Sequence, residues 1–234
     1  MRVRFVVRTL SELCVTAGTL IVLFVVYVLY WTGIRADSAM DDELGRLQDR
    51  WSTGPVAGAA GTAGAARAAD PAAASRSYRD GESFAVMYIP RLGAGWAKPV
   101  LHGTGTELLK KGLGHYERTA RLGGKGNFAV AGHRRTYGDP FKDLPELRPG
   151  DAVVLTDGTT WFTYRVDAAP HRTRPDDIGV IDPVPAGSGF RGPGRYLTLT
   201  TCEPEWGHSH RLIVWAHLDA TSPVTEGRPK ALAG

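Results

Sequence analysis

The sequence predicts a mainly β domain, a sandwich or a barrel with few helices, preceded by one transmembrane helix. Two observations predict this arrangement. From Gly81 onward, short runs rich in Val, Ile, Thr, Tyr and Phe alternate with Gly, Pro and Asp, and several such runs at this spacing are typical of all-β folds. Before them, residues 13–34 form an uncharged run, and about 20 apolar residues suffice to cross about 30 Å of hydrocarbon.

The composition limits the classes of protein that the chain can belong to. Its 234 residues are 43% hydrophobic and 22% charged, which indicates one folded domain with extensions. The net charge of +4 is modest, and without a basic stripe we expect no nucleic-acid partner. The two cysteines, Cys14 and Cys202, are too few for a multi-disulfide scaffold or a four-cysteine zinc site.

The run 13–34, LCVTAGTLIVLFVVYVLYWTGI, is predicted to be an uncleaved membrane anchor. Its C-terminal end carries the aromatic residues of an interfacial belt, Tyr27, Tyr30 and Trp31. The alternative is a cleaved signal peptide, but such a peptide has an apolar region of only about 7–15 residues before a small-residue site. The segment that follows, IRADSAM, is a poor cleavage site.

The charges around this run predict its orientation. Arg2, Arg4 and Arg8 precede it, whereas acidic residues dominate positions 37–43. Since positive residues stay inside, we expect a cytoplasmic N-terminus at 1–12, a single-pass anchor in the cell membrane and an extracellular remainder. Cys14 would then lie near the cytoplasmic edge, as an apolar filler or, alternatively, a palmitoylation site.

Residues 35–81 are predicted to connect the anchor to the folded part. A short exposed helix over 36–50 would lead into a flexible Ala- and Gly-rich tether over 52–79. An Ala-rich helix is the competing interpretation of the tether, but its repeated Gly and Pro71 weaken that interpretation. The folded domain would then occupy 82–220 and a C-terminal tail 221–234.

Within the domain, β-branched and aromatic runs bounded by turn residues predict seven strands. They lie at 83–89, 98–103, 126–133, 152–156, 160–169, 195–201 and 211–218. Helical structure is expected only at 106–114 and in a turn around 139–147. The Pro- and Gly-rich stretch 172–194 is expected to be irregular, and irregular segments of such length are usually functional or mobile.

Cys202 is the strongest candidate for chemistry. It is the one cysteine of the exported part, so it has no partner for a disulfide within the chain. It follows the strand-like LTLTT and precedes Glu203 and Pro204, so the end of a strand would present it at a rim. We therefore favour a nucleophile, although a buried inert thiol or a bond between chains are alternatives.

A cysteine nucleophile needs a proton-transfer partner and a group that stabilises an oxyanion. His133 is the first candidate partner because AGHR also ends a strand-like run, and Gly132 leaves room for close approach. His208 and His210 lie nearer to Cys202 in sequence and remain alternatives. A zinc site of the C-x5-H-x-H type lacks a suitably spaced fourth ligand, so we expect neither a metal nor a cofactor.

Arg211 is the candidate for oxyanion stabilisation. It opens the strand-like RLIVWAHL, and it would return close to Cys202 if 195–201 and 211–218 are antiparallel neighbours. A guanidinium stays charged and offers a rigid fork of donors. Five other arginines are rivals by residue type: Arg134, Arg135, Arg172, Arg174 and Arg195.

These residues resemble the signature of the sortase family. TLTTC at 198–202 followed by Arg211 is similar to the family's TLxTC…R pattern, and AGHR at 131–134 resembles its histidine motif. The anchor, tether and single β-rich domain match the sortase layout, over roughly residues 82–219. GHY, GNFAVAGHRRTYGDPF and LRPGD resemble most closely the class E sortases of actinobacteria, although classes D and F share part of this pattern.

The resemblance implies a fold, an activity and partners. The fold would be a closed eight-stranded β-barrel, with the strand missing from the seven near 179–185. The activity would be that of a cysteine transpeptidase with a peptidase half-reaction, which cleaves an LAxTG or LPxTG sorting signal after Thr through a thioacyl intermediate. The acyl group would pass to the amine of a peptidoglycan precursor and anchor surface proteins to the cell wall.

The resemblance also implies residue roles. Cys202 would be the nucleophile, His133 the acid and base, and Arg211 the oxyanion and substrate-backbone ligand. Thr201 would contribute to substrate binding, and Tyr137 would favour LAxTG over LPxTG. The segment 172–194 would shape the sorting-signal groove. Two rivals remain: an L,D-transpeptidase, which would show an SHGC-type motif instead of TTCEP, and a surface adhesion module, which would not need Cys202.

Overall fold

The computed structural model describes residues 2–53 and 78–233, without the side chains of residues 2, 3, 28–34 and 36. One long helix, α1, spans Arg2–Thr53, and a one-turn helix, α2, spans Thr106–Leu109. The nine strands are β1 Ser83–Tyr88, β2 Ala97–His102, β3 Leu113–His115, β4 Gly126–Ala131, β5 Ala152–Thr156, β6 Thr160–Val166, β7 His171–Thr173, β8 Arg195–Glu203 and β9 His210–Pro223.

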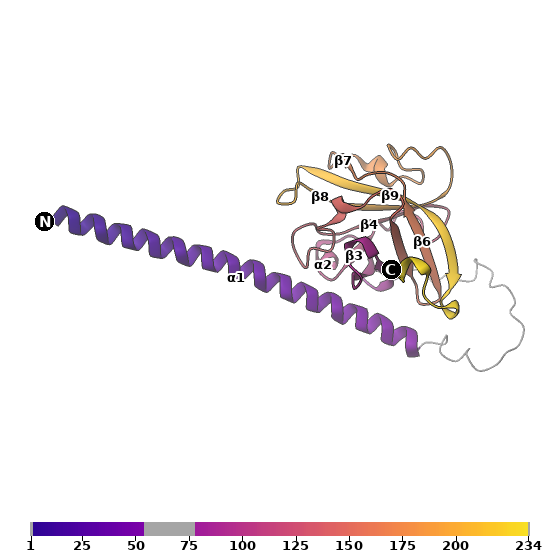
Figure 1. The fold of residues 1–234 in the computed structure, drawn as a ribbon, viewed down its shortest axis with the longest axis horizontal. Helices are drawn as coiled ribbons and strands as arrows, with labels where there is room; N and C mark the ends of the chain where they lie inside the picture. The colour runs from indigo at the N-terminus through magenta and orange to yellow at the C-terminus, as the bar shows by residue number, and fades with distance from the viewer. Residues whose placement is uncertain (1, 54–77, 234) are drawn as a thin grey trace, which may run out of the picture.

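Eight of these strands close into a barrel (Figure 1). The strand order is β6-β5-β1-β2-β3-β4-β8-β9, and β9 pairs back onto β6 between Val166 and Thr160, so the ring has no open edge. β7 lies outside this ring and pairs with the first part of β9. The closed eight-stranded barrel expected from the sequence is confirmed.

The structure corrects the position of the missing strand. All seven strands expected from the sequence are present, but residues 178–181 form the 3-10 helix η4 (Ile178–Ile181) rather than a strand. The eighth strand of the ring is β3, at the end of the stretch expected to be helical, where only Thr106–Leu109 is α-helix. β3 has only three residues, too few for an alternating pattern to be recognised. The turn expected at 139–147 contains the 3-10 helix η3, Leu144–Glu146.

The barrel interior contains alternate side chains of its strands, as a closed sheet requires. Along β4, β8 and β9 the inward positions are occupied by buried apolar residues, namely Phe128, Val130, Leu197, Leu199, Leu212, Val214 and Ala216. The outward Ile213 and Trp215 of β9 are also buried, because Val180 of η4 packs on them. The segment that carries η4 therefore covers the outer face of β8 and β9.

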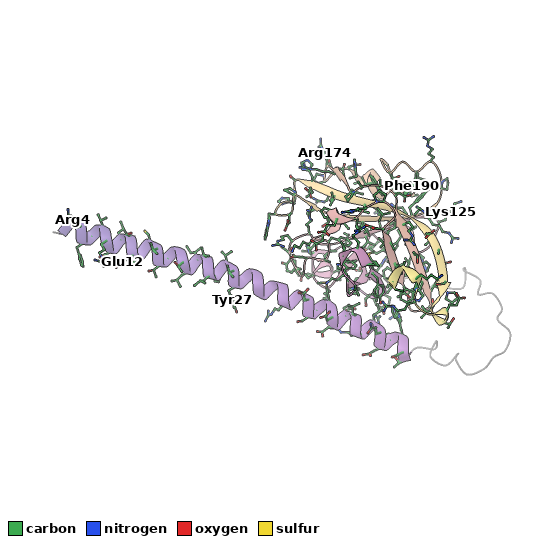
Figure 2. The ribbon with its side chains drawn as sticks, viewed as in Figure 1. Arg4, Glu12, Tyr27, Lys125, Arg174 and Phe190 are labelled. Atoms are coloured by element: carbon green, nitrogen blue, oxygen red, sulfur yellow. The ribbon has the colours of Figure 1, made fainter. Side chains whose placement is uncertain are left out.

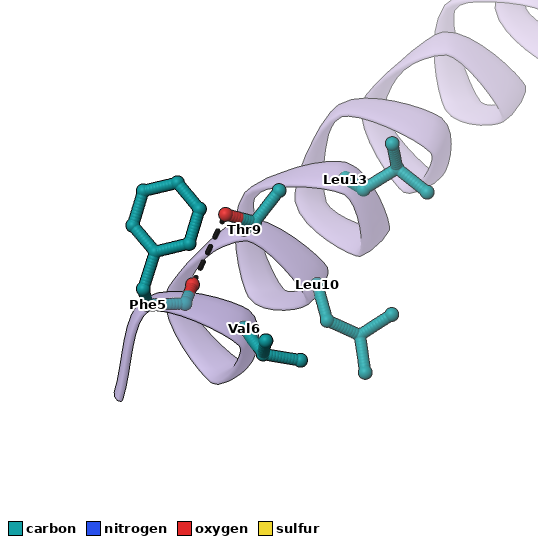
Figure 3. A pocket seen from close by; sticks show the side chains of 5 residues that line it. All are labelled: Phe5, Val6, Thr9, Leu10 and Leu13. Carbon is teal, nitrogen blue, oxygen red and sulfur yellow. Dashed lines mark hydrogen bonds between the residues drawn. The ribbon is translucent and has the colours of Figure 1, made fainter. Parts of the chain in front are cut away.

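The N-terminal part of α1 stands clear of the barrel (Figure 1), and its apolar side chains are exposed. Arg4–Tyr27 is the stretch of the described residues that is long and apolar enough to cross a membrane. Figure 3 shows its first turns, where Phe5, Val6 and Leu10 project outward and the Thr9 hydroxyl donates to the Phe5 carbonyl at 3.0 Å. Such a bond satisfies a hydroxyl without water.

The C-terminal part of α1 corrects the expectation of a short exposed helix over 36–50. The helix runs without interruption through this region and packs against the barrel with one face. Met40 and Leu47 are 1% and 2% exposed, and the buried Glu43 accepts a hydrogen bond of 2.5 Å from Ser83 of β1. Arg50 donates to the Ser83 carbonyl at 2.8 Å. The tether expected over 52–79 lies largely outside the described residues.

The chain beyond position 220 continues the barrel instead of leaving it at once. β9 extends to Pro223, where Thr160 of β6 is its partner. Two single-turn 3-10 helices follow, Val224–Glu226 and Lys230–Leu232. The Arg228 guanidinium lies 5.6 Å from the ring centroid of Tyr88 on β1.

Candidate active site

Cys202 and Arg211 lie on the adjacent strands β8 and β9, and His133 lies just beyond the end of the neighbouring strand β4. In the antiparallel pair of β8 and β9, Cys202 stands directly opposite Arg211, so the expected return of Arg211 is present. β4 and β8 are parallel, and their register runs as far as Ala131 opposite Thr200. The Gly132 amide still donates to the Thr200 carbonyl at 3.1 Å, so His133, two residues beyond the end of β4, lies near the level of Cys202.

The alternation of side chains places all three on the outer face of the barrel. Leu197 and Leu199 point inward on β8, so Cys202 has the outward parity, and Arg211 shares it with the outward Ile213 of β9. A side chain at Gly132 would meet Phe141 and Leu113 of the interior at 2.6 and 2.8 Å. Because the position before it faces inward, His133 faces outward. Glycine is needed at 132 for this close packing.

The β4 and β8 strand ends are joined by hydrogen bonds beyond the strand register. The Gly132 amide donates to the Thr200 carbonyl at 3.1 Å, and the Thr201 hydroxyl donates to the Gly132 carbonyl at 2.8 Å. Thr201 is buried. Its hydroxyl therefore fixes the backbone between the two candidate catalytic residues.

His133 is half-buried, and its Nε2 atom is buried and makes no hydrogen bond within the described residues. Burial lowers the pKa of this imidazole; the nearby Asp139 carboxylate raises it, and Lys110 lowers it. The neutral ring is therefore favoured at neutral pH. A ring nitrogen without a protein partner is free to exchange a proton with a bound molecule.

Tyr137 lies beside His133, with the two ring centroids 5.1 Å apart. Its backbone is in the left-handed region at φ 54°, as are those of Gly138 at 76° and Asp139 at 47°. Such consecutive left-handed residues form a tight loop, and they cost energy at non-glycine positions. The loop is closed by a 3.0 Å bond from the Phe141 amide to the His133 carbonyl.

Arg211 is fixed by the backbone of the β8–β9 hairpin. Its Nη1 donates to the carbonyls of His208 at 3.1 Å and His210 at 3.0 Å. These two histidines, the alternative partners for the thiol, therefore contribute carbonyl oxygens to the position of Arg211. Within the described residues, no three His, Cys, Asp or Glu side chains are grouped so that they could hold a metal ion.

Arg134 contacts Cys202 and Glu203, whereas the sequence presents it only as a rival of Arg211. It is buried, and its Nη1 donates to the Cys202 carbonyl at 3.3 Å and to the Glu203 carboxylate. Arg134 therefore links the segment directly after His133 to both Cys202 and Glu203. Its position directly after the candidate histidine was the available signal.

The other rival arginines have other partners or positions. Arg135 pairs with Asp139 and Glu205, and Arg174 pairs with the neighbouring Asp176 at 2.9 Å. Arg172 donates to the His210 ring at 3.0 Å. Arg195 opens β8 at the end of the strand opposite to Cys202.

Comparisons with known proteins agree with this geometry. The sortase domain family matches residues 87–219. The structure is similar to that of sortase E from Streptomyces avermitilis, with 73% identity, a TM-score of 0.63 and coverage of 66% of this chain and 99% of that chain. A structure of sortase E1 from Streptomyces coelicolor with a tripeptide in its active site is 38% identical, with a TM-score of 0.62 and coverage of 67% and 99%.

Full-length relatives extend the similarity beyond the barrel. Sortase SrtE1 of Streptomyces coelicolor is 37% identical over 96% of this chain, which spans 60% of that protein's length. Sortase SrtE2 of the same organism is 32% identical over 97% of this chain and 88% of its own length. The similarity to class E expected from the sequence is confirmed.

Proposed function

Because the chain belongs to the sortase family, we propose that it is a cysteine transpeptidase that attaches proteins carrying an LAxTG or LPxTG sorting signal to the cell wall. The observation that carries this proposal is that Cys202 of β8 stands opposite Arg211 of β9, next to the end of β4 that leads into His133. A nucleophile, a proton carrier and a fixed cation on one face are the groups that acyl transfer requires.

In the first half-reaction, the Cys202 thiolate attacks the carbonyl carbon of the signal's Thr. The oxyanion that forms lies beside Arg211, whose guanidinium carries a permanent positive charge. When the intermediate collapses, the peptide C–N bond breaks and the His133 imidazolium donates a proton to the leaving amine. The products are a thioester on Cys202 and the released peptide that followed Thr.

In the second half-reaction, the amine of a peptidoglycan precursor attacks the thioester carbonyl. Neutral His133 accepts the proton that this amine loses, and the C–S bond breaks. An amide joins the signal to the precursor, and Cys202 returns to its thiolate with His133 protonated. If water attacks instead, the same steps give hydrolysis.

The protonation states limit how much enzyme is active. The reaction starts from a thiolate and an imidazolium, but burial lowers the pKa of His133. At neutral pH most molecules therefore carry the neutral ring, and the active pair is a minority form. Any group that raises the pKa of His133, as Asp139 does, increases that fraction.

Two further residues have proposed roles in recognition. Tyr137, with its ring next to His133, is placed to contact the residue that distinguishes LAxTG from LPxTG signals. Thr201 would contribute to substrate binding indirectly, because its hydroxyl donates to the Gly132 carbonyl and so holds the backbone beside the site. The segment 172–194 packs through Val180 on the face that carries Cys202 and Arg211, so it would flank the bound signal on one side.

We also propose that α1 anchors the enzyme in the cell membrane, with the N-terminus in the cytoplasm and the barrel outside. The support is the apolar stretch Arg4–Tyr27 and the position of Arg2, Arg4 and Arg8 before the uncharged run that begins at Leu13. The hydroxyls of Thr16 and Thr19 donate to carbonyls four residues earlier, at 2.8 and 2.9 Å, as an apolar surrounding requires.

The test is cleavage of LAxTG and LPxTG peptides by the purified full chain. We expect cleavage between Thr and Gly, loss of cleavage in Cys202→Ala, and unchanged cleavage in Cys14→Ala. Cys14 is the matched control because it is the other thiol of the chain and lies exposed on α1. Cleavage that survives Cys202→Ala would overturn the proposed mechanism.

A further inference from the structure

We propose that the end of the barrel bearing Cys202 and His133 faces the lipid bilayer, and that the β8–β9 hairpin touches the bilayer's headgroup region through Trp206. The proposal rests on the membrane anchoring proposed above and goes beyond it, because it states which surface of the enzyme meets lipid. Three features of the molecule support it: the continuity of α1, the direction of its docking and the exposure of Trp206.

The first step is that α1 joins the apolar stretch to the barrel as one unbroken helix, Arg2–Thr53. The apolar stretch continues in the sequence to Ile34, three residues before Asp37. At a rise of about 1.5 Å per residue, Asp37 lies about 4.5 Å beyond the end of that stretch. A helix has no hinge over this distance, so the bilayer lies close to whatever part of the barrel meets Asp37.

The second step is that the His133 loop is the part that meets Asp37. A Cβ at Gly138 would lie 2.6 Å from the Asp37 carboxylate and 2.2 Å from the end of Met40. A Cβ at Gly158, in the β5–β6 turn, would lie 2.5 Å from Trp51. Asp37 and Trp51 are about 21 Å apart along the helix. The loop after His133 is therefore at the bilayer end of the barrel and the β5–β6 turn at the opposite end.

The third step places Cys202 at the same end. β4 and β8 are parallel and both run towards the His133 loop, since Ala131 and Thr200 are partners near their ends. Lys125, directly before β4, marks where these strands begin. In Figure 2, Lys125 lies on the side of the barrel away from Tyr27 and the N-terminal half of α1. The strands therefore run from the far end towards the bilayer end.

The fourth step concerns the hairpin that follows Cys202. Trp206 is 67% exposed, and among the described residues outside α1 only Ile178 is another large hydrophobic side chain so exposed. The Arg135 guanidinium lies 4.1 Å above the indole and pairs with Glu205 at 3.4 Å and Asp139 at 3.5 Å. These contacts tie the hairpin to the His133 loop and so keep Trp206 at the bilayer end.

The chemistry of this tip fits lipid headgroups. An exposed indole prefers the boundary between water and hydrocarbon, where its ring is sheltered and its N–H keeps a polar partner. The neighbouring Arg135, Glu205 and Asp139 are charged, which keeps the tip out of the hydrocarbon. The tip would therefore rest at headgroup depth, with the active site opening beside it.

The experiment measures the depth of Trp206 in membranes. The full chain is reconstituted in vesicles of phosphatidylcholine and phosphatidylglycerol that carry a nitroxide on the choline headgroup. Since the chain has six tryptophans, the Trp206 signal is the difference between the wild type and Trp206→Phe. The matched control is Thr159→Trp made in the Trp206→Phe background, which puts an indole at an exposed position of the β5–β6 turn.

We expect the Trp206 signal to be quenched by the nitroxide and shifted to shorter wavelength relative to the protein in detergent. The signal of the indole introduced at position 159 should show neither change. Absence of quenching at Trp206, or equal quenching at both positions, would overturn the proposal; an unquenched but blue-shifted Trp206 would indicate a protein partner instead of lipid.

The result is separable from the proposed function. Quenching needs no substrate and should persist in Cys202→Ala, so failure of transpeptidation leaves it intact. Flotation of the full chain with the vesicles tests anchoring alone. Flotation without quenching of Trp206 would overturn the orientation while leaving the anchor in place.

Discussion

The ion pair between Arg134 and Glu203 should couple the two halves of the active site. The side chains are 10% and 22% exposed, and Arg134 also donates to the Cys202 carbonyl at 3.3 Å. Arg134→Met removes the positive charge and leaves the Glu203 carboxylate largely buried. Breaking a fully buried pair costs about 3–5 kcal/mol, and the partial exposure of Glu203 puts the expected loss near about 3 kcal/mol.

The double variant separates this coupling from the loss of either side chain. In Arg134→Met with Glu203→Gln, no buried charge is left unpaired. The remaining cost should be about 1 kcal/mol, for the lost hydrogen bond to the Cys202 carbonyl. The double variant should therefore be more stable than Arg134→Met alone, although it carries more substitutions.

The assay is urea unfolding of the full chain in detergent, combined with steady-state cleavage of a sorting-signal peptide. We expect kcat to fall in Arg134→Met and in Glu203→Gln with little change in KM, because the ion pair positions Cys202 and His133 and does not contact the signal. If the unfolding costs of the two single variants simply add in the double variant, the pair does not couple the strand ends and the reasoning is refuted.

Three other predictions address separate parts of the molecule. Burial lowers the pKa of His115 to about 4, so the folded state loses about 3 kcal/mol of stability as the pH falls from about 6.5 to about 4, because only the unfolded chain takes up a proton in this range. The difference in unfolding free energy between these two pH values should be smaller in His115→Gln. Met40→Ala should cost about 2–3 kcal/mol and expose residues 37–53 to proteolysis, whereas Asp41→Ala, at an exposed position, should not. Tyr137→Phe and Tyr137→Ala should change the ratio of LAxTG to LPxTG cleavage, and an unchanged ratio in both would exclude Tyr137 from recognition.

The sequence predicted those strands that have a regular pattern and enough residues to display it. β1, β2, β4, β5, β6, β8 and β9 all have five residues or more and contain β-branched or aromatic residues. β3 and β7 have three residues each and are held extended by pairing with neighbouring strands, so no local sequence pattern predicts them. The assignment of 179–185 as a strand failed because its apolar residues pack as a single 3-10 turn on β9.

The docking of α1 was missed although its signal was present. Met40, Leu44, Leu47 and Trp51 follow helical spacing and form one apolar stripe. The surrounding acidic residues suggested a solvated helix. Glu43 is buried beside this stripe, but its partner Ser83 lies forty residues away, so the sequence gives no sign that a carboxylate is accommodated there. The placement of Arg211 opposite Cys202 was predictable, since it needed only an antiparallel hairpin. The position of Arg134 directly after His133 was a signal, but its contacts with Cys202 and Glu203 depend on the parallel pairing of β4 with β8, which the sequence does not show.

Cys202 should carry the acyl group during transfer, and this covalent step is the centre of the proposed mechanism. The most direct measurement is intact-mass analysis of the full chain after brief incubation with an LAxTG peptide, in the absence of any added amine. We predict a mass increase equal to the peptide that ends in Thr, less one water, located on Cys202 and removed by hydroxylamine or an amine acceptor. Cleavage without this adduct, or an adduct that persists in Cys202→Ala, would contradict the mechanism.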